Sequence, residues 1–157
     1  MNPFLLDTSS RRVAWKLLRE EILEQSSPDA QIDLALTFWK QAPIENPLID
    51  WDNAEKWPTP WELLHTNRFC EGALTLGVAY TLILSSPEHF QDLGLLLITD
   101  RQNHVQKIVA KTHSQVLNYG WLDRLPATTI KNCQVHSRWW FDGRNWQNQF
   151  SPEKRLS

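Results

Sequence analysis

The sequence predicts an α+β fold formed by a single domain. Helix signals fill residues 10–39, an apolar segment occupies residues 70–84, and strand-like runs separated by polar turns follow from residue 93. Helices first and strands afterwards are typical of an antiparallel sheet packed against helices. A chain of 157 residues is long enough to bury a core without disulfides or metals. We expect N-terminal helices, a buried central helix and an antiparallel sheet of about four or five strands.

The first expected helix covers residues 10–25. Its apolar side chains at Val13 and Leu17, followed by Leu23, indicate an amphipathic helix. Ser9 or Ser10 provides its N-cap. The second expected helix starts at Pro28 and continues to Trp39, with Ser27 as N-cap and Pro43 beyond its end.

Prolines and tryptophans dominate the next segment, residues 41–60. Its four prolines oppose a regular helix, so we expect an extended wrap pinned by Trp51 and Trp57 (Pro43, Pro47, Pro58 and Pro60). One helical turn is expected at residues 61–64. The run 70–84 is apolar on nearly every side, as in a buried central helix, and its glycines indicate close packing (Gly72 and Gly77).

The second half of the chain has the alternation of strands. The expected strands cover residues 93–99, 104–110, 114–119, 134–141 and 144–147. Asp142-Gly143 between the last two tolerates the positive φ angles of a tight two-residue hairpin. The whole is expected to form one domain over residues 1–150, with an N-terminal helical portion (1–45), a core (46–150) and a flexible tail (151–157).

Composition narrows the class of protein. The net charge is −2 and the lysines and arginines are scattered, which argues against nucleic-acid binding. No apolar run has the length of a signal-peptide core or a membrane span, so we expect a soluble protein of a reducing compartment. Nine tryptophans exceed what a core of this size ordinarily takes, and tryptophan is enriched at interfaces. Other proteins are therefore the expected partners.

One cysteine lies where a nucleophile would be useful. Cys70 stands at the start of the apolar helix, and a helix N-terminus lowers the pKa of a thiol. His104 opens a later strand and could accept the thiol proton, while Asn118 in the third strand could orient the imidazole. The order of these three residues along the sequence predicts a Cys-His-Asn catalytic triad.

Each of these residues also has a structural interpretation. Cys70 could be a small buried apolar side chain, the commonest fate of a free cysteine. His104 could belong to the polar turn before its strand, and Asn118 to a turn before Tyr119. The two cysteines and the histidines lack metal-ligand spacing, so no metal or other cofactor is expected.

Short motifs carry a resemblance to a known family. WPTPWEL at residues 57–63, FCEGA at 69–73, NHV at 103–105 and VLN at 116–118 resemble the bacterial transglutaminase-like cysteine peptidases and the papain-like transglutaminase core. The resemblance covers roughly residues 50–147 and implies that fold, with Cys70, His104 and Asn118 as its catalytic residues. A tryptophan-bearing hairpin over residues 139–146 also matches the family.

The motif around the cysteine departs from the family. Arg68-Phe69-Cys70-Glu71-Gly72 stands in place of Gly-Asp-Cys-Glu-Asp, and Asn118 stands where the peptidases usually have aspartate. The WPTPWELL form is also similar to small proteins of tailed bacteriophages. We therefore hypothesise a structural or assembly subunit of a phage particle, located in the virion or the host cytoplasm.

The alternative hypothesis is an active cysteine hydrolase of the peptidase or amidase type. For the structural hypothesis the candidate contacts with partner proteins, in an oligomer or larger assembly, are Trp139, Trp140 and Trp146. Neighbours in a strand point to opposite faces, so one of Trp139 and Trp140 is expected to face outward.

Overall fold

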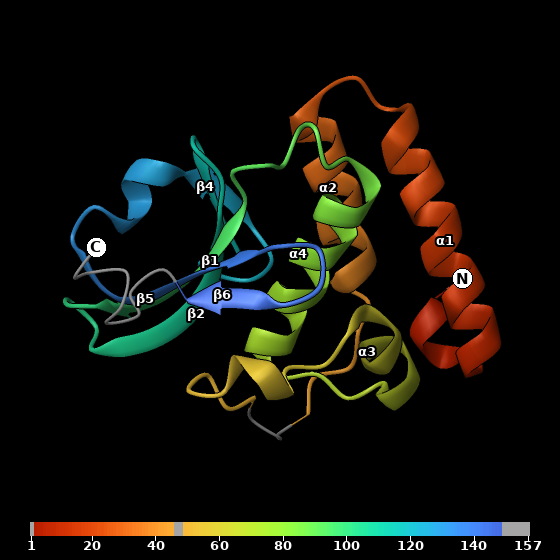
Figure 1. The fold of residues 1–157 in the computed structure, drawn as a ribbon, viewed down its shortest axis with the longest axis horizontal. Helices are drawn as coiled ribbons and strands as arrows, with labels where there is room; N and C mark the ends of the chain where they lie inside the picture. Colours follow the sequence, from red (N-terminus) through yellow and green to blue (C-terminus); the bar gives the residue numbers. More distant parts are fainter. Residues whose placement is uncertain (1, 46–48, 149–157) are drawn as a thin grey trace. The chain divides into compact units, whose positions relative to one another are not determined.

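The computed structural model describes residues 2–45 and 49–148, and Figure 1 shows its helices and antiparallel sheet. Contacts divide the chain into two compact units. A helical unit comprises Met1–Ile49 and Pro58–Gln91, and a sheet unit comprises Asp50–Trp57 and Asp92–Ser157. The central helix groups with the N-terminal helices, so the division does not follow the boundary expected at residue 45. The expected tail, residues 151–157, and Pro47 lie outside the described residues.

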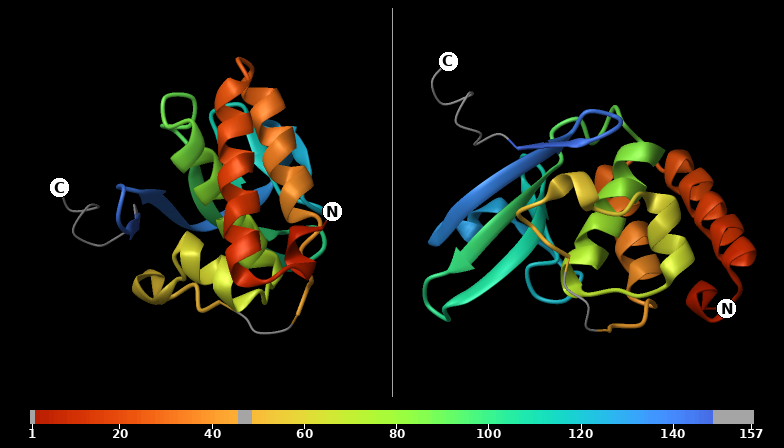
Figure 2. Two further views of the ribbon diagram at one scale, coloured as in Figure 1. Left: turned by 90° about the vertical axis from the view of Figure 1, so that its right-hand side faces the viewer. Right: turned by 60° about the horizontal axis from the view of Figure 1, so that its bottom comes forward.

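Among its described residues, the helical unit contains four α-helices and a short 3-10 helix. They are η1 (Pro3–Leu5), α1 (Thr8–Glu24), α2 (Pro28–Trp39), α3 (Pro60–Thr66) and α4 (Glu71–Ser85). Within this unit α1, α2 and α4 contact one another, and α3 contacts both α1 and α4 (Figures 1 and 2). Among the described residues, no helix has the length and apolar character needed to span a bilayer.

Helix α1 turns a different face inward from the expected one. Its buried side chains are Arg11, Trp15, Leu18 and Ile22, whereas Val13, Leu17 and Leu23 are exposed. The prediction was wrong because two apolar stripes coexist on this helix, and the stripe that contains the large indole of Trp15 buries more area. The N-cap is Asp7, whose carboxylate accepts the Ser10 N–H at 2.7 Å, and not Ser9 or Ser10.

Helices α2 and α3 begin where sequence signals indicate. Helix α2 covers Pro28–Trp39 with Ser27 as N-cap, which confirms both predicted positions. Helix α3 is longer than the expected single turn and starts with Pro60 after the N-cap Thr59. Thr59 and Glu62 form a reciprocal capping box, in which each side chain accepts the other's backbone N–H at 3.2 Å. The proline and the box together determine where α3 begins.

Helix α4 is buried along most of its length, as predicted. Thr81 is its central polar group: its hydroxyl accepts the indole N–H of Trp15 at 3.0 Å and of Trp39 at 2.9 Å, and donates to the Gly77 carbonyl at 2.7 Å. A Cβ at Gly77 would lie 2.8 Å from the Trp39 ring, so only glycine admits this indole. The predicted close packing at Gly77 is confirmed.

In the part that the structure describes, the sheet unit contains one six-stranded antiparallel sheet in the order β4-β3-β2-β1-β5-β6. Its strands are β1 (Gly94–Asp100), β2 (Val105–Lys111), β3 (Gln115–Leu117), β4 (Arg124–Pro126), β5 (Cys133–Phe141) and β6 (Trp146–Asn148). Two 3-10 helices accompany them, η2 (Ala54–Lys56) and η3 (Ala127–Ile130). Figure 2 shows the long strands β1, β2 and β5 twisting alongside one another.

The sheet differs from the prediction in two places. Strand β4 was missed because its three residues carry too short a pattern. The last hairpin has a four-residue loop, closed by a 3.0 Å bond from the Asp142 N–H to the Asn145 carbonyl, and not a two-residue loop. The Asp142 carboxylate accepts the N–H groups of Arg144 and Asn145, and this Asx-type turn delays β6 until Trp146. Gly143 has φ +104°, the positive value that was predicted.

One face of the sheet carries an apolar cluster of its own. Leu96, Ile98, Val109, Val116 and Ile130 are buried together, with Tyr119, Leu125, Cys133 and Val135 packed against them. The strand register places Leu96 opposite Val109, so both point to this face. Val109 is therefore committed to packing within the sheet unit.

Candidate functional site

Cys70 is the N-cap residue of α4, in the position that the sequence predicted. It has extended backbone angles, φ −95° and ψ 173°, and its side chain makes no capping hydrogen bond. Only 7% of its surface is exposed. The preceding Phe69 is fully buried, and its ring packs edge-on against Phe4 and Trp39. The bulky residue beside the thiol is thus an anchor of the helical core.

His104 lies in the polar turn between β1 and β2 and is exposed. Its φ of +56° is unusual for a residue with a side chain. The turn is organised by Asp100, whose carboxylate accepts the N–H of Gln102 at 2.9 Å and the side-chain amide of Asn103 at 3.0 Å. The imidazole therefore projects from a loop tip and not from the first residue of a strand.

Asn118 follows the end of β3 with φ +65°. Its side-chain oxygen accepts the Leu122 N–H at 2.7 Å, and its own N–H donates to the Asp123 carbonyl at 2.9 Å. It is buried and organises the turn that leads to β4. A left-handed asparagine with a side chain bonded to a nearby backbone N–H is a common turn device.

The sheet register separates His104 from Asn118. Ala110 pairs with Leu117, so the next position on β2, Val109, lies opposite Asn118. His104 is five residues farther along from Val109, about 17 Å at the rise of a β-strand. An imidazole and its orienting amide must be within hydrogen-bond reach. The predicted contact between Asn118 and His104 is therefore not formed.

A different polar cluster joins the strand ends near this turn. The Tyr119 hydroxyl donates to Asp100 at 3.0 Å and lies 4.0 Å from the Cys133 sulfur. Lys107 donates to the Tyr119 carbonyl at 2.5 Å, with its ammonium group 4.6 Å from the centre of the Tyr119 ring. Strand pairing places Asp100 directly opposite Cys133. No sequence motif could reveal this cluster, because its members come from separate elements.

Ionisation within the cluster is perturbed. Burial raises the pKa of Tyr119, and the hydrogen bonds to Asp100 and Cys133 raise it further. The hydrogen bond from Tyr119 is in turn the largest cause that lowers the pKa of Asp100. The tyrosine therefore stays a neutral donor and Asp100 an ionised acceptor over the physiological range. This arrangement joins the Tyr119 hydroxyl to the end of β1 at Asp100 and to the start of β5 at Cys133.

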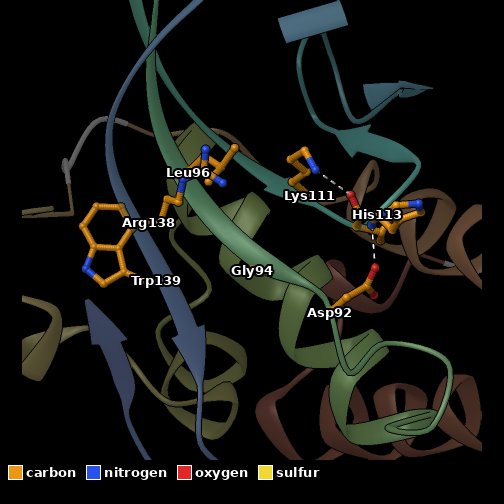
Figure 3. A pocket seen from close by; sticks show the side chains of 8 residues that line it. Asp92, Gly94, Leu96, Lys111, His113, Arg138 and Trp139 are labelled. Atoms are coloured by element: carbon orange, nitrogen blue, oxygen red, sulfur yellow. Dashed lines mark hydrogen bonds between the residues drawn. The ribbon is translucent and has the colours of Figure 1, made fainter. Parts of the chain in front are cut away.

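A second group of polar side chains lines a pocket of about 220 Å³ on the sheet (Figure 3). Lys111 and Arg138 come from β2 and β5, and His113 lies in the loop after β2. Asp92 accepts the His113 backbone N–H at 2.5 Å, and the Lys111 ammonium group donates to the Thr112 carbonyl at 3.0 Å. The pocket contains more cationic than anionic side chains, and Lys111 and Asp92 are already engaged in loop contacts.

The tryptophans predicted as partner contacts divide by strand alternation. Trp139 and Trp146 are buried, whereas Trp140 is 39% exposed. The expected outward ring is therefore Trp140. Trp139 contacts Trp51 and Trp57, with ring centres 6.2 and 5.0 Å away, and Trp57 contacts Trp146 at 6.1 Å. Trp51 and Trp57 therefore hold their segment against β5 and β6, in agreement with the anchoring role predicted for these two residues.

Across residues 2–45 and 49–148, no three histidine, cysteine, aspartate or glutamate side chains gather closely enough to hold an ion.

Solved structures provide the remaining comparison. No protein-family model and no curated protein matches the chain. Calcium-bound LapG of Legionella pneumophila is similar with a TM-score of 0.69 and 17% identity, over 97% of this chain and 86% of LapG. A second LapG structure gives a TM-score of 0.66 and 16% identity over 96% and 83% of the two chains, and an EGTA-treated form gives 0.65 and 16% over 88% and 76%. LapG is a bacterial transglutaminase-like cysteine protease.

The fold is transglutaminase-like. The resemblance stated from the sequence motifs is confirmed at the level of fold, and identities of 16–17% carry it no further. The likeness to tailed-phage proteins gains no support from these neighbours.

Proposed function

We propose that this chain is a non-catalytic binding module built on a transglutaminase-like fold. The observation that carries the proposal is the register of β2 and β3, which puts Val109 opposite Asn118 and leaves His104 about 17 Å away. A triad needs its base in contact with its orienting residue. Val109 instead packs in the apolar cluster of the sheet, and Asn118 caps a turn.

The environment of Cys70 supports the same proposal. The thiol is almost wholly buried, and Phe69 beside it anchors the helical core. A free cysteine in such a place ordinarily acts as a small apolar side chain. Fold retention with loss of catalytic chemistry is a familiar outcome, since function depends on site residues more than on the fold.

A structural or assembly subunit of a tailed-phage particle is the specific form of this proposal that the sequence resemblance suggests. Its test is mass spectrometry of purified particles together with the oligomeric state of the isolated protein. A chain that is absent from particles and monomeric at all concentrations would refute that specific form. The broader binding role would then rest on the groove described in the next subsection.

An active cysteine hydrolase is the second candidate. It is favoured by Cys70 at the N-cap of a long helix, beside the unpaired N–H groups of the first turn, and by the similarity of the fold to LapG. In this candidate Cys70 is the nucleophile, His104 the base and Asn118 the orienting residue.

Thiol alkylation separates the two candidates. In a Cys133→Ser background Cys70 is the only thiol, so the rate of its reaction with iodoacetamide can be followed by mass from about pH 5 to pH 9. We expect slow alkylation that is the same in His104→Ala and in the matched loop variant His113→Ala, and fast alkylation after unfolding in urea. Rapid alkylation of the folded protein near pH 6, abolished by His104→Ala alone, would overturn the non-catalytic proposal.

A further inference from the structure

A groove of about 470 Å³ lies within the sheet unit, between the segment Asp50–Trp57 and the strands β5 and β6. Trp51, Asp52 and Glu55 line it from the segment, and Trp139, Trp146 and Gln147 line it from the strands. Its size suits one or two side chains of a bound segment.

Aromatic contacts pack the tryptophans of the groove against one another. The rings of Trp51 and Trp57 meet edge-on with centres 4.8 Å apart, and the Trp57 indole N–H donates to the Asp50 carbonyl at 2.8 Å. Trp57 also packs against Trp139 with centres 5.0 Å apart. A preformed site loses less conformational entropy when it binds a ligand.

The acidic side chains that line the groove favour a cationic ligand. Asp52 and Glu55 are the ionisable residues among the described residues that line it, and both are exposed. Lys56 follows Glu55 but does not line the groove. Carboxylates next to indole rings attract guanidinium and ammonium groups, through charge and through the negative face of the ring.

The same residues disfavour a sugar ligand. Sugar rings stack on open indole planes, whereas Trp57, Trp139 and Trp146 are only 6%, 3% and 7% exposed. Trp51 is half-buried, so part of its side chain is open to the flat guanidinium group of an arginine. The side-chain amide of Gln147 adds a polar group of the kind that pairs with a peptide backbone.

We propose that this groove binds an extended segment of a partner protein through its arginine or lysine side chains. The cationic head lies between Asp52 and Glu55, and its aliphatic stem packs against Trp51. The inference rests on the proposed binding function and names the surface and the partner chemistry for it.

A short fluorescein-labelled peptide of alternating glycine and arginine tests the proposal by fluorescence anisotropy. The matched probe replaces each arginine with citrulline, which keeps the shape and removes the charge. The test variant is Asp52→Asn/Glu55→Gln, and the control is Glu21→Gln/Glu24→Gln, which makes the same charge change on the exposed face of α1. Circular dichroism and the melting temperature confirm that each variant folds.

We expect the arginine peptide to bind, with affinity reduced about tenfold or more by the groove variant and less than about twofold by the control. Trp51→Ala should weaken binding, and Trp51→Phe should restore part of it because an aromatic face remains. Equal binding of the citrulline peptide, equal binding by the groove variant, or no binding would overturn the proposal. Binding of an N-acetylglucosamine oligosaccharide in place of the peptide would also overturn it.

The result is distinguishable from failure of the proposed function. A His104-dependent reactive thiol would refute the non-catalytic role whatever the peptide does. Loss of peptide binding with an inert thiol would refute only this groove.

Discussion

The helical unit and the sheet unit differ in where their main networks of polar side chains lie. The helical unit buries several at its centre, where Thr81 satisfies two indole N–H groups and Gln31 donates to the Ile22 carbonyl. The sheet unit places its polar cluster at strand ends, where Tyr119, Asp100 and Lys107 meet near an exposed turn. A buried hydrogen bond that loses its partner costs far more than an exposed one. The helical unit therefore tolerates less change.

The difference bears on function. The helical unit retains the feature that a thiol nucleophile needs, a cysteine at the start of a buried helix. In the sheet unit Ala110 pairs with Leu117, and this register leaves His104 far along the chain from the position opposite Asn118. Packing preserves a fold through many residues, whereas catalysis depends on the identity of a few. The four predictions that follow test this contrast, from the largest expected effect to the smallest.

Thr81→Val should give the largest loss of stability. Valine has the shape of threonine but leaves the indole N–H groups of Trp15 and Trp39 without an acceptor, at about 1–3 kcal/mol each. We expect urea denaturation to show a loss of about 3 kcal/mol. The control Ser85→Ala removes a hydroxyl that only donates to the Thr81 carbonyl, and it should cost less than about 1 kcal/mol. Similar losses in the two variants would refute the central role of Thr81.

Asn118→Ala should cost about 2 kcal/mol, half from the left-handed backbone and half from the lost acceptor for Leu122. Asn118→Gly accepts the positive φ angle without strain and should cost about 1 kcal/mol. Urea denaturation of both variants measures the difference. If glycine is as damaging as alanine, the backbone conformation contributes nothing and the side-chain contacts account for the whole effect.

Tyr119→Phe should change the pH dependence of stability at alkaline pH. The pKa of Tyr119 is raised in the folded protein, by burial first and by its bond to Asp100 second. Its contribution is therefore complete below about pH 10, the unfolded pKa, and is lost as the pH rises above it. As the pH rises above about 10, the native chain should lose more stability than Tyr119→Phe does. Parallel losses in the two proteins would contradict this assignment.

Glu45→Gln should have the smallest effect. The Arg68–Glu45 ion pair has an N–O distance of 3.4 Å, but its side chains are 69% and 49% exposed. Solvent screening limits such pairs to about 0.5 kcal/mol or less. Thermal denaturation in low and high salt measures the contribution. A loss above 1 kcal/mol, about twice what an exposed ion pair supplies, would mean that the segment ahead of Cys70 depends on this contact.

Local signals in the sequence were reliable where a few adjacent residues decide the outcome. Ser27 and Pro28 begin α2 as predicted, and the apolar run after Cys70 forms a buried helix. Gly143 takes the positive φ angle expected of it. Each result follows from backbone preferences or from continuous apolarity, which need no knowledge of distant residues.

The buried face of a helix and the pairing of strand residues were less predictable from the sequence. Val13 and Leu17 fit the helical period as well as Trp15 and Leu18 do, and only the neighbouring helices determine which stripe is buried. The predicted contact between His104 and Asn118 depended on which residues of neighbouring strands pair. His104 and Asn118 have a suitable order in the sequence, yet strand register separates them.

The sequence by itself determined the α+β class, the start of α2 and the position of Cys70 at a helix N-terminus, because propensity, capping and hydrophobic period act over a few residues. Tertiary structure decided which face of α1 is buried, that Tyr119 meets Asp100 and Cys133, and that Val109 lies opposite Asn118. Those outcomes depend on register and packing between residues far apart in the chain, and a one-residue change in register would move every side chain of a strand to the other face.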